Sequence, residues 1–297
     1  MTTRRGPWRQ AAARFLRRPL GVVALAAVAA FFVVALLAPV LAPYPVGQIF
    51  IELIQHPQAP LARSHLLGTD VLGHDYLTAM LFAIRGTMLS AFFCAVLATG
   101  VGVVVGLVAG YVRGPIEATS SFFMRVIVTV PAIAVLGFVS TRYKFLLTPF
   151  QNALWLALLF WPTVSRVVIT SVASLRTREF VEAAHAAGAS TTRILLRHLL
   201  PNVSGPIVVA ATWIVSQAIV VVATVQYLGY SYNEAHQPTL GGLVADGTNA
   251  PALILAGNVG IGAVWWLYVL PSVVLVVLLL AVTFLGDSLD EALNPAA

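Results

Sequence analysis

The chain has 297 residues, of which 59% are hydrophobic and only 9% are charged. Soluble domains carry about 25% charged residues, so this composition excludes an ordinary soluble protein and indicates an integral membrane protein. The basic excess, 17 Lys and Arg against 11 Asp and Glu, does not indicate nucleic-acid binding, because six arginines fall within the first 18 residues and act as a topology signal. The single cysteine, Cys94, excludes a disulfide framework and a cysteine-based metal cluster.

The first uncharged apolar run covers residues 20–42 and follows these six arginines. The apolar core of a signal peptide has about 7–15 residues, whereas a run of this length crosses the hydrocarbon layer as a helix. We therefore interpret 20–42 as a retained first span. Residues 1–19 are predicted to form a cytoplasmic basic surface helix, with Phe15 and Leu16 inserted toward the acyl chains.

Five further apolar stretches, 86–112, 120–141, 146–165, 203–228 and 265–285, predict six spans in total. Arg125 is expected near a membrane interface, and Arg166 ends the fourth stretch. With both termini inside, the cytoplasmic segments hold 12 Lys and Arg and the outer segments four, and Arg166 is unassigned. The positive-inside rule therefore predicts an N-in, C-in topology, with residues 287–297 as a cytoplasmic tail. The small-residue spacing of Gly102, Gly106 and Gly110 predicts close helix packing.

Two long outer segments are predicted, 44–84 and 229–263. The first holds His65, Asp70, His74 and Asp75, whose spacing matches no known metal cage, so no metal site is predicted and the role of these residues stays open. The second segment is acidic, without Lys or Arg, and is expected to be a solvated loop.

The cytoplasmic segment 176–202 joins the fourth and fifth spans. Alanine-rich residues after Glu179 favour a helix that Gly188 ends, because glycine readily adopts the left-handed conformation that closes a helix. Ser190 or Thr191 can cap a second short helix, and Pro201 is expected to end it. This hairpin either docks a partner or lies on the membrane surface, and its residues alone leave both alternatives open.

The motifs of this hairpin resemble those of a known family. Glu182-Ala183-Ala184, followed by Gly188 and by Leu200-Pro201, resembles the EAA loop of binding-protein-dependent ABC importer permeases. Further stretches are similar to the C-type subunit of the oligopeptide and dipeptide permeases, and they occur in order over nearly the whole chain: residues 38–44, 65–70, 72–75, 197–202, 227–229 and 285–295.

This resemblance implies an all-α integral membrane protein of the bacterial inner (plasma) membrane. It implies six transmembrane helices in the ABC importer permease (type I) fold, N-in and C-in, with 20–286 as the permease domain. It also implies a multi-pass, non-catalytic subunit that forms a heterodimer with a B-type permease. Its other implied partners are two ATP-binding subunits, an extracytoplasmic solute-binding protein and membrane lipid. ATP and Mg²⁺ bind to the ATP-binding subunits, and no cofactor is expected in this chain. ATPase coupling then falls to the hairpin 176–202, through Glu182, Ala183, Ala184, Gly188, Arg197 and Pro201.

The implied substrate is a peptide, either a dipeptide or an oligopeptide, and the alternative is a nickel complex, glutathione or another small solute. The sequence departs from the family at His74, where arginine is usual, and at Val222, where relatives often have glutamate. The general EAA pattern has isoleucine at the position of His198, although histidine there is usual in the peptide subfamily.

Three observations bear on mechanism. The only lysine is Lys144, so a nucleotide P-loop is impossible and a partner must hydrolyse ATP. No Asp or Glu lies inside an assigned span, which disfavours a proton-driven carrier, and no His lies at membrane depth to activate an intramembrane serine. Ser216, Gln217 and Thr224 are candidates to line a substrate path, and interhelical hydrogen bonding is the other interpretation of these residues.

Overall fold

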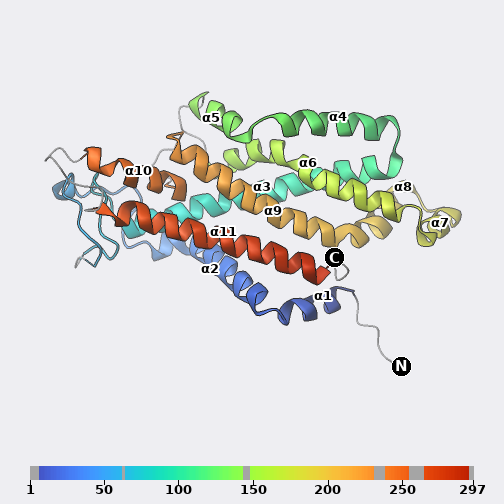
Figure 1. Ribbon diagram of the computed structural model, residues 1–297, viewed down its shortest axis with the longest axis horizontal. Coiled ribbons are helices and arrows are strands. Elements are labelled where there is room, and N and C mark those ends of the chain that lie inside the picture. The colour runs from blue at the N-terminus through green and yellow to red at the C-terminus, as the bar shows by residue number, and fades with distance from the viewer. Residues whose placement is uncertain (1–6, 62–63, 143–147, 231–237, 254–263, 294–297) are drawn as a thin grey trace.

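A computed structural model describes residues 7–61, 64–142, 148–230, 238–253 and 264–293. The regular elements of these ranges are helices, with one isolated β-bridge between Thr69 and Asp75. In chain order (Figure 1) they are α1 (Pro7–Leu16), α2 (Pro19–Leu41), the 3₁₀ turn η1 (Ile51–Leu53), α3 (Tyr76–Val112), α4 (Pro115–Thr129), α5 (Ala132–Arg142), α6 (Pro149–Leu175), α7 (Glu179–Ala186), α8 (Thr191–Arg193), the π-helical segment η2 (Ile194–Leu199), α9 (Leu200–Tyr227), α10 (Leu240–Leu253) and α11 (Trp266–Leu293).

The predicted six spans are confirmed, with one change of shape. Within the described residues, five helical stretches are long and apolar enough to cross a membrane, and α4 with α5 forms a sixth that is bent by 73°. The predicted third span, 120–141, is therefore wrong as a single straight helix. Val130 is extended ahead of Pro131, because the proline ring disfavours the helical conformation in the residue before it.

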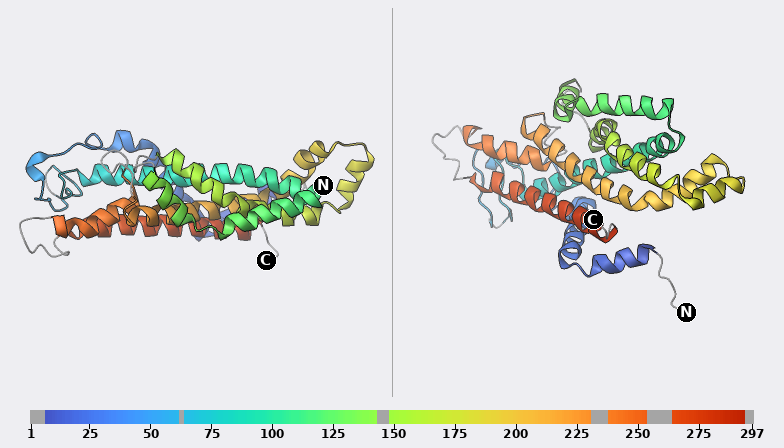
Figure 2. Two further views of the ribbon diagram at one scale, coloured as in Figure 1. Left: turned by 90° about the horizontal axis from the view of Figure 1, so that it is seen from above. Right: turned by 45° about the vertical axis from the view of Figure 1, so that its right-hand side comes forward.

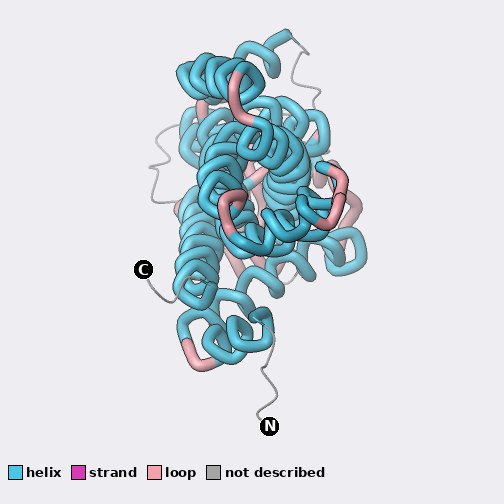
Figure 3. Tube along the Cα trace, turned by 90° about the vertical axis from the view of Figure 1, so that its right-hand side faces the viewer, coloured by secondary structure: helices cyan, strands magenta, loops and turns pink. Residues whose placement is uncertain are grey.

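The long helices form a bundle with two distinct ends. In Figure 1, α4, α6, α9 and α11 follow one another from top to bottom, and α3 runs behind α6 and α9 and packs against both. The view from above shows the same elongated bundle (Figure 2), and the end-on view looks along its helices (Figure 3). The chain after α2 and helix α10 lie at one end, and the hairpin of α7 and α8 lies at the other. This separation agrees with the predicted topology.

Helices α3 and α6 pack most closely, and glycines make this possible. A Cβ atom at Gly102 would lie 2.7 Å from Val164 Cβ, and one at Gly106 would lie 2.6 Å from Val168 Cβ. The next pair along this contact line, the seam between α3 and α6, is Gly110 with Val172. Each valine of α6 thus fills the space that a missing side chain leaves on α3, which confirms the close packing that the small-residue spacing predicts.

The N-terminal helix packs against protein, although it was predicted to insert toward lipid. Phe15 is buried in a cluster with Ala24, Leu285 and Ala292. Arg14 donates a hydrogen bond to the Ala292 carbonyl at 3.0 Å, and Arg18 forms an ion pair with Glu291. The prediction for Phe15 is therefore wrong, whereas Leu16 is 67% exposed.

The C-terminal segment also differs from its prediction. Helix α11 continues without interruption to Leu293, so the described part of 287–297 is the end of this helix and not a separate tail. Burial of Ser288 and Ala292 accounts for the extension, because both side chains lie against the rest of the bundle. Residues 294–297 lie outside the described residues.

The two histidines and two aspartates singled out in the first outer segment form two separate pairs. His65 Nδ1 lies 2.8 Å from Asp75 Oδ2, and both side chains are buried. Asp75 also accepts the Thr78 backbone N–H at 2.8 Å, so it caps the first turn of α3. His74 Nδ1 lies 2.8 Å from Asp70 Oδ2. In the described part of the chain no three such side chains come close enough to hold a metal ion.

The second outer segment is not the solvated loop that its composition predicts. Residues Leu240–Leu253 form helix α10, in which Leu240 and Ala250 are fully buried. A Cβ atom at Gly241 would lie 2.2 Å from the Ala223 carbonyl oxygen of α9. Because α10 packs directly on the backbone of its neighbour, this part of the segment belongs to the core. Glu234, His236 and the glycines 257, 260 and 262 lie outside the described residues.

The stability of the folded outer segment is expected to depend on pH through the ionisation of His74. Its hydrogen bond with Asp70 raises the pKa of His74 above the ordinary value of 6.5, with a further contribution from the charge of Asp246. A raised pKa means that the stabilisation is complete below about pH 6.5 and is lost as pH rises through the higher folded value. Hydrogen exchange of the amides of residues 65–75, corrected for its intrinsic rate, should therefore accelerate between pH 6 and pH 8.

The matched variant for this prediction is Asp70→Asn. Asp70 Oδ1 accepts the backbone N–H groups of Leu72 at 2.9 Å and His74 at 2.7 Å, and asparagine keeps an oxygen for both. Asparagine also replaces Oδ2, the atom that faces His74 Nδ1, by an uncharged NH₂ group, so most of the pH dependence should be lost while the Oδ1 bonds preserve the loop conformation. Equal protection of wild type and variant at both pH values would contradict the role of this pair.

Candidate functional site

The hairpin at the end opposite the outer segments is built from α7, a glycine turn and α8. Val181 of α7 and Ile194 of the returning segment are buried, so they attach the hairpin to the bundle. The opposite face of α7 is exposed and consists of Glu179, Glu182, Ala183 and Ala186, which are spaced as one side of a helix. This face combines small residues, which allow close approach of another backbone, with two acidic side chains.

The turn depends on Gly188. Its φ is +77°, and its N–H donates to the His185 carbonyl at 2.9 Å while the Ala189 N–H donates to the Ala184 carbonyl at 3.0 Å. These two bonds form a Schellman motif, which confirms the prediction that Gly188 ends the first helix. A Cβ at this position would meet no atom within 4 Å, so the requirement for glycine is conformational and not a matter of space.

The second arm begins as predicted but does not end at Pro201. The Ser190 side chain accepts the Arg193 N–H at 3.4 Å and caps α8. The chain then passes through the π-helical segment η2 into α9, and Thr191–Tyr227 is one helical unit of 37 residues. The π turn shifts the backbone bonds ahead of the proline, with Leu200 N–H donating to the Leu195 carbonyl, five residues back. Asn202 Nδ2 donates to the His198 carbonyl at 2.6 Å and compensates for part of the interrupted bonding.

The predicted hairpin residues lie together at this end of the bundle. Glu182, Ala183 and Gly188 are exposed on α7 and the turn, and Ala184 is half-buried against the core. Arg197 and Pro201 are exposed on the returning segment. The geometry offers an exposed, defined knob whose second arm continues directly into a membrane-spanning helix.

The predicted path residues on α9 differ in exposure. Gln217 is exposed, whereas Ser216 and Thr224 are half-buried and the Thr224 hydroxyl donates to the Val220 carbonyl at 2.8 Å. Val222 is fully buried. Gln217 is thus the most exposed of the three predicted side chains.

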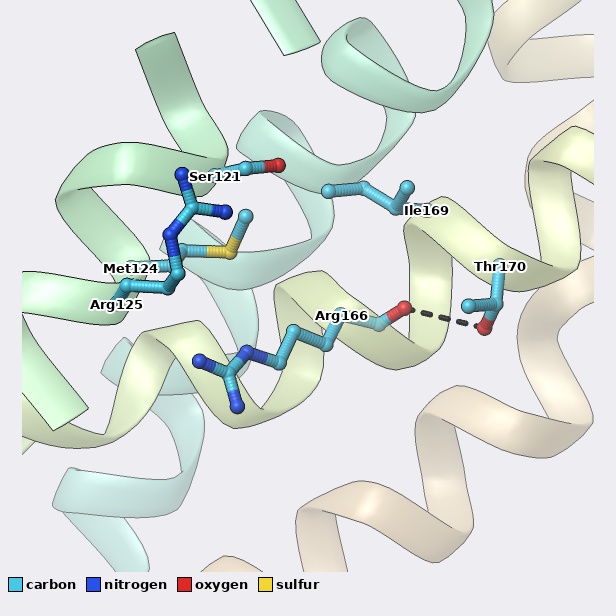
Figure 4. A pocket seen from close by; sticks show the side chains of 6 residues that line it. All are labelled: Ser121, Met124, Arg125, Arg166, Ile169 and Thr170. Atoms are coloured by element: carbon cyan, nitrogen blue, oxygen red, sulfur yellow. Dashed lines mark hydrogen bonds between the residues drawn. The ribbon is translucent and has the colours of Figure 1, made fainter. Parts of the chain in front are cut away.

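Sequence reasoning missed a second polar feature, between α4 and α6. A pocket of about 400 Å³ is lined by Ser121, Met124 and Arg125 of α4 and by Arg166, Ile169 and Thr170 of α6 (Figure 4). Arg166 does not end its span as predicted, because α6 continues for nine residues to Leu175. A signal was present in the sequence: Thr163, Arg166 and Thr170 follow one another at helical spacing within an apolar run.

These helices and their burial pattern define a multi-pass helical membrane protein. The family model for the binding-protein-dependent transport system inner membrane component matches residues 102–297, and a model for the N-terminal TM domain of oligopeptide transport permease C matches residues 6–60. The chain belongs to the first of these families, the inner membrane components of binding-protein-dependent transport systems. It is therefore a permease component of the inner membrane, as the hairpin and terminal motifs predict.

Individual relatives cover nearly the whole chain. The oligopeptide transport system permease protein OppC of Mycobacterium tuberculosis (strain H37Rv) is 33% identical over 96% of this chain and 93% of the relative. The dipeptide transport system permease protein DppC of Alkalihalophilus pseudofirmus is 30% identical over 97% of this chain and 90% of the relative. Among solved structures, an inward-facing MetNI methionine ABC transporter matches with a TM-score of 0.49 and 22% identity, covering 72% of this chain and 93% of that chain.

Proposed function

We propose that this chain is the C-type permease subunit of an ATP-driven importer of peptides, and that it forms the translocation path together with a homologous B-type permease. The observation that carries the proposal is the exposed hairpin, which stands apart from the apolar bundle at its predicted cytoplasmic end. Relatives named as oligopeptide and dipeptide permeases support the substrate class.

In this mechanism the hairpin 176–202 is the coupling element. The acidic, small-residue face of α7 docks in a groove of an ATP-binding subunit, with Glu182 at the contact and Gly188 maintaining the turn. ATP and Mg²⁺ bind to the two ATPase subunits, and their closure displaces the hairpin. Since Thr191–Tyr227 is one helical unit, this displacement moves α9 together with the hairpin and switches the path between inward-open and outward-open states.

The opposite end of the bundle is suited to receive the solute-binding protein. The described parts of 44–84 and 229–263 lie at this end (Figure 1), and α10 of the second segment packs against α3 and α11, with Leu240 N–H donating to the Thr87 hydroxyl of α3 at 3.2 Å. Trp266 Nε1 donates to the Thr69 carbonyl at 3.4 Å, and the Tyr76 hydroxyl donates to the Leu267 carbonyl. These bonds tie the loop before α3 to the start of α11, so docking at either outer segment affects the same helices.

The test is ATP hydrolysis by this chain co-expressed with its genomic neighbours and reconstituted in lipid. We expect the ATPase and a second permease to co-purify with it, and hydrolysis to rise when a peptide-loaded binding protein is added. A complex assembled without this chain is the control and should show no such stimulation. Stimulation by a nickel complex, glutathione or another solute in place of peptide would contradict the substrate, and the absence of an associated ATPase would contradict the function.

A further inference from the structure

The cytoplasmic half of α6 exposes polar side chains at membrane depth. Thr163, Arg166 and Thr170 are exposed and lie on one side of the helix, whereas further out the same helix exposes Leu154 and Leu158. A helix surrounded by lipid presents apolar residues along its whole exposed surface, so the inner part of α6 is not adapted to lipid.

A second arginine reaches the same level from α4. Arg125 lies ten residues after the start of α4 at Pro115, about 15 Å along the helix, and Arg166 lies nine residues before the end of α6, about 14 Å along it. Both helix ends lie on the predicted cytoplasmic side. The two arginines are therefore about equally deep, although they come from helices that run in opposite directions.

Both arginines line one pocket, which they approach from opposite sides (Figure 4). In Figure 4 the Arg166 side chain extends away from Thr170, toward the outer end of α6, so it does not reach back to the cytoplasmic surface. The Arg125 side chain turns back toward Ser121, one helical turn nearer the cytoplasm. Both residues line the pocket of about 400 Å³ between the helices, and their guanidinium groups extend in opposite directions from it (Figure 4).

Neither arginine has a carboxylate partner among the residues that the structure describes. The arginines that do pair with an acid there are Arg18, with Glu291, and Arg113, with Glu117, both near helix ends. An intramembrane arginine without a counter-ion is costly unless it meets water or an anion. Two of them at one open pocket constitute a site that requires negative charge.

We infer that Arg125 and Arg166 form a carboxylate-binding site in the cytoplasmic half of the translocation path, which takes the carboxylate of a peptide in transit. The inference rests on the proposed function. Guanidinium groups donate paired N–H bonds that match the geometry of a carboxylate, and Ser121 and Thr170 line the same pocket. The site explains why the inner half of α6 is polar: it lines water and substrate.

Water access to this face is tested by cysteine labelling in the assembled complex. Cys94 is buried, so a Cys94→Ala background leaves one thiol at a chosen position. A charged maleimide added from the cytoplasmic side should label Thr170→Cys and should not label the control Leu158→Cys on the same helix. Equal labelling of the two positions, or none at Thr170→Cys, would overturn the assignment of this face to the path.

Recognition of the carboxylate charge is tested with two substrates, trialanine and its C-terminal amide. The uptake of each into proteoliposomes is measured at a concentration that saturates the binding protein. Arg125→Gln and Arg166→Gln should each lower trialanine uptake by about tenfold, the usual effect of losing a charged hydrogen bond. Arg166→Lys should retain part of the uptake, and Arg142→Gln, at the exposed end of α5, should match wild type. Uptake of the amide should not change in any variant.

Other outcomes separate the alternatives. Stimulation of ATP hydrolysis by the loaded binding protein should stay within twofold of wild type in every arginine variant. The absence of an associated ATPase from the wild-type complex would contradict the proposed function and not this site. A loss of uptake that is equal for peptide and amide, and that depends on anionic lipid, would assign the arginines to lipid phosphate and overturn the inference. Failure of the glutamine variants to bind the second permease would overturn it in favour of a subunit interface.

Discussion

Replacement of Gly188 by valine is expected to lower coupled uptake by about tenfold while leaving the six spans inserted. Gly188 has φ of +77° at the turn between α7 and α8, where a residue with a Cβ costs about 1–2 kcal/mol and a β-branched residue costs more. Such a cost lowers the fraction of hairpins in the docking conformation by about tenfold. The measurement is uptake and ATP hydrolysis of the reconstituted complex, with membrane insertion assessed by protease protection.

Gly188→Asn is the matched control, because asparagine tolerates the left-handed conformation and the position has no neighbour within 4 Å. It should retain most of the uptake. Charge reversal at the exposed Glu182 leaves the turn intact and, under the proposed docking to an ATPase, should also uncouple hydrolysis from uptake. Wild-type uptake in both Gly188→Val and Glu182→Arg would remove the hairpin from the mechanism.

Replacement of Gly106 by alanine is expected to destabilise the whole bundle. The new Cβ would lie 2.6 Å from Val168 Cβ and 2.9 Å from the Ser165 carbonyl oxygen, so α3 and α6 must separate. Overpacking of this kind costs about 1–3 kcal/mol, which corresponds to a fall of about 5 °C in the unfolding temperature. Thermal unfolding of the purified protein in detergent measures the effect.

Gly100 provides the control on the same helix. A Cβ at Gly100 meets nothing within 4 Å, so Gly100→Ala should be neutral or slightly stabilising through its higher helix propensity. Equal unfolding temperatures for Gly106→Ala and Gly100→Ala would show that the seam between α3 and α6 tolerates an extra methyl group, against the observed packing.

Much of the candidate site could be predicted because its determinants are local. The turn at Gly188 and the cap at Ser190 depend on a few neighbouring residues, and the structure has both as predicted. The continuation past Pro201 could not be predicted in this way, since it depends on the π turn upstream and on the Asn202 side chain. The pocket residues were missed because Arg125 and Arg166 are 41 positions apart in the sequence and become neighbours only when α4 packs beside α6.

The sequence by itself determined the class of protein and the position of the hairpin, and it predicted the spans and the topology. These follow from how each residue partitions between water and lipid, and from turn conformations that a single glycine decides. Only the tertiary structure decided the burial of α10, the packing of Phe15 and the position of two arginines at one pocket. Each of these depends on contacts between segments far apart in the chain, which composition and spacing do not encode.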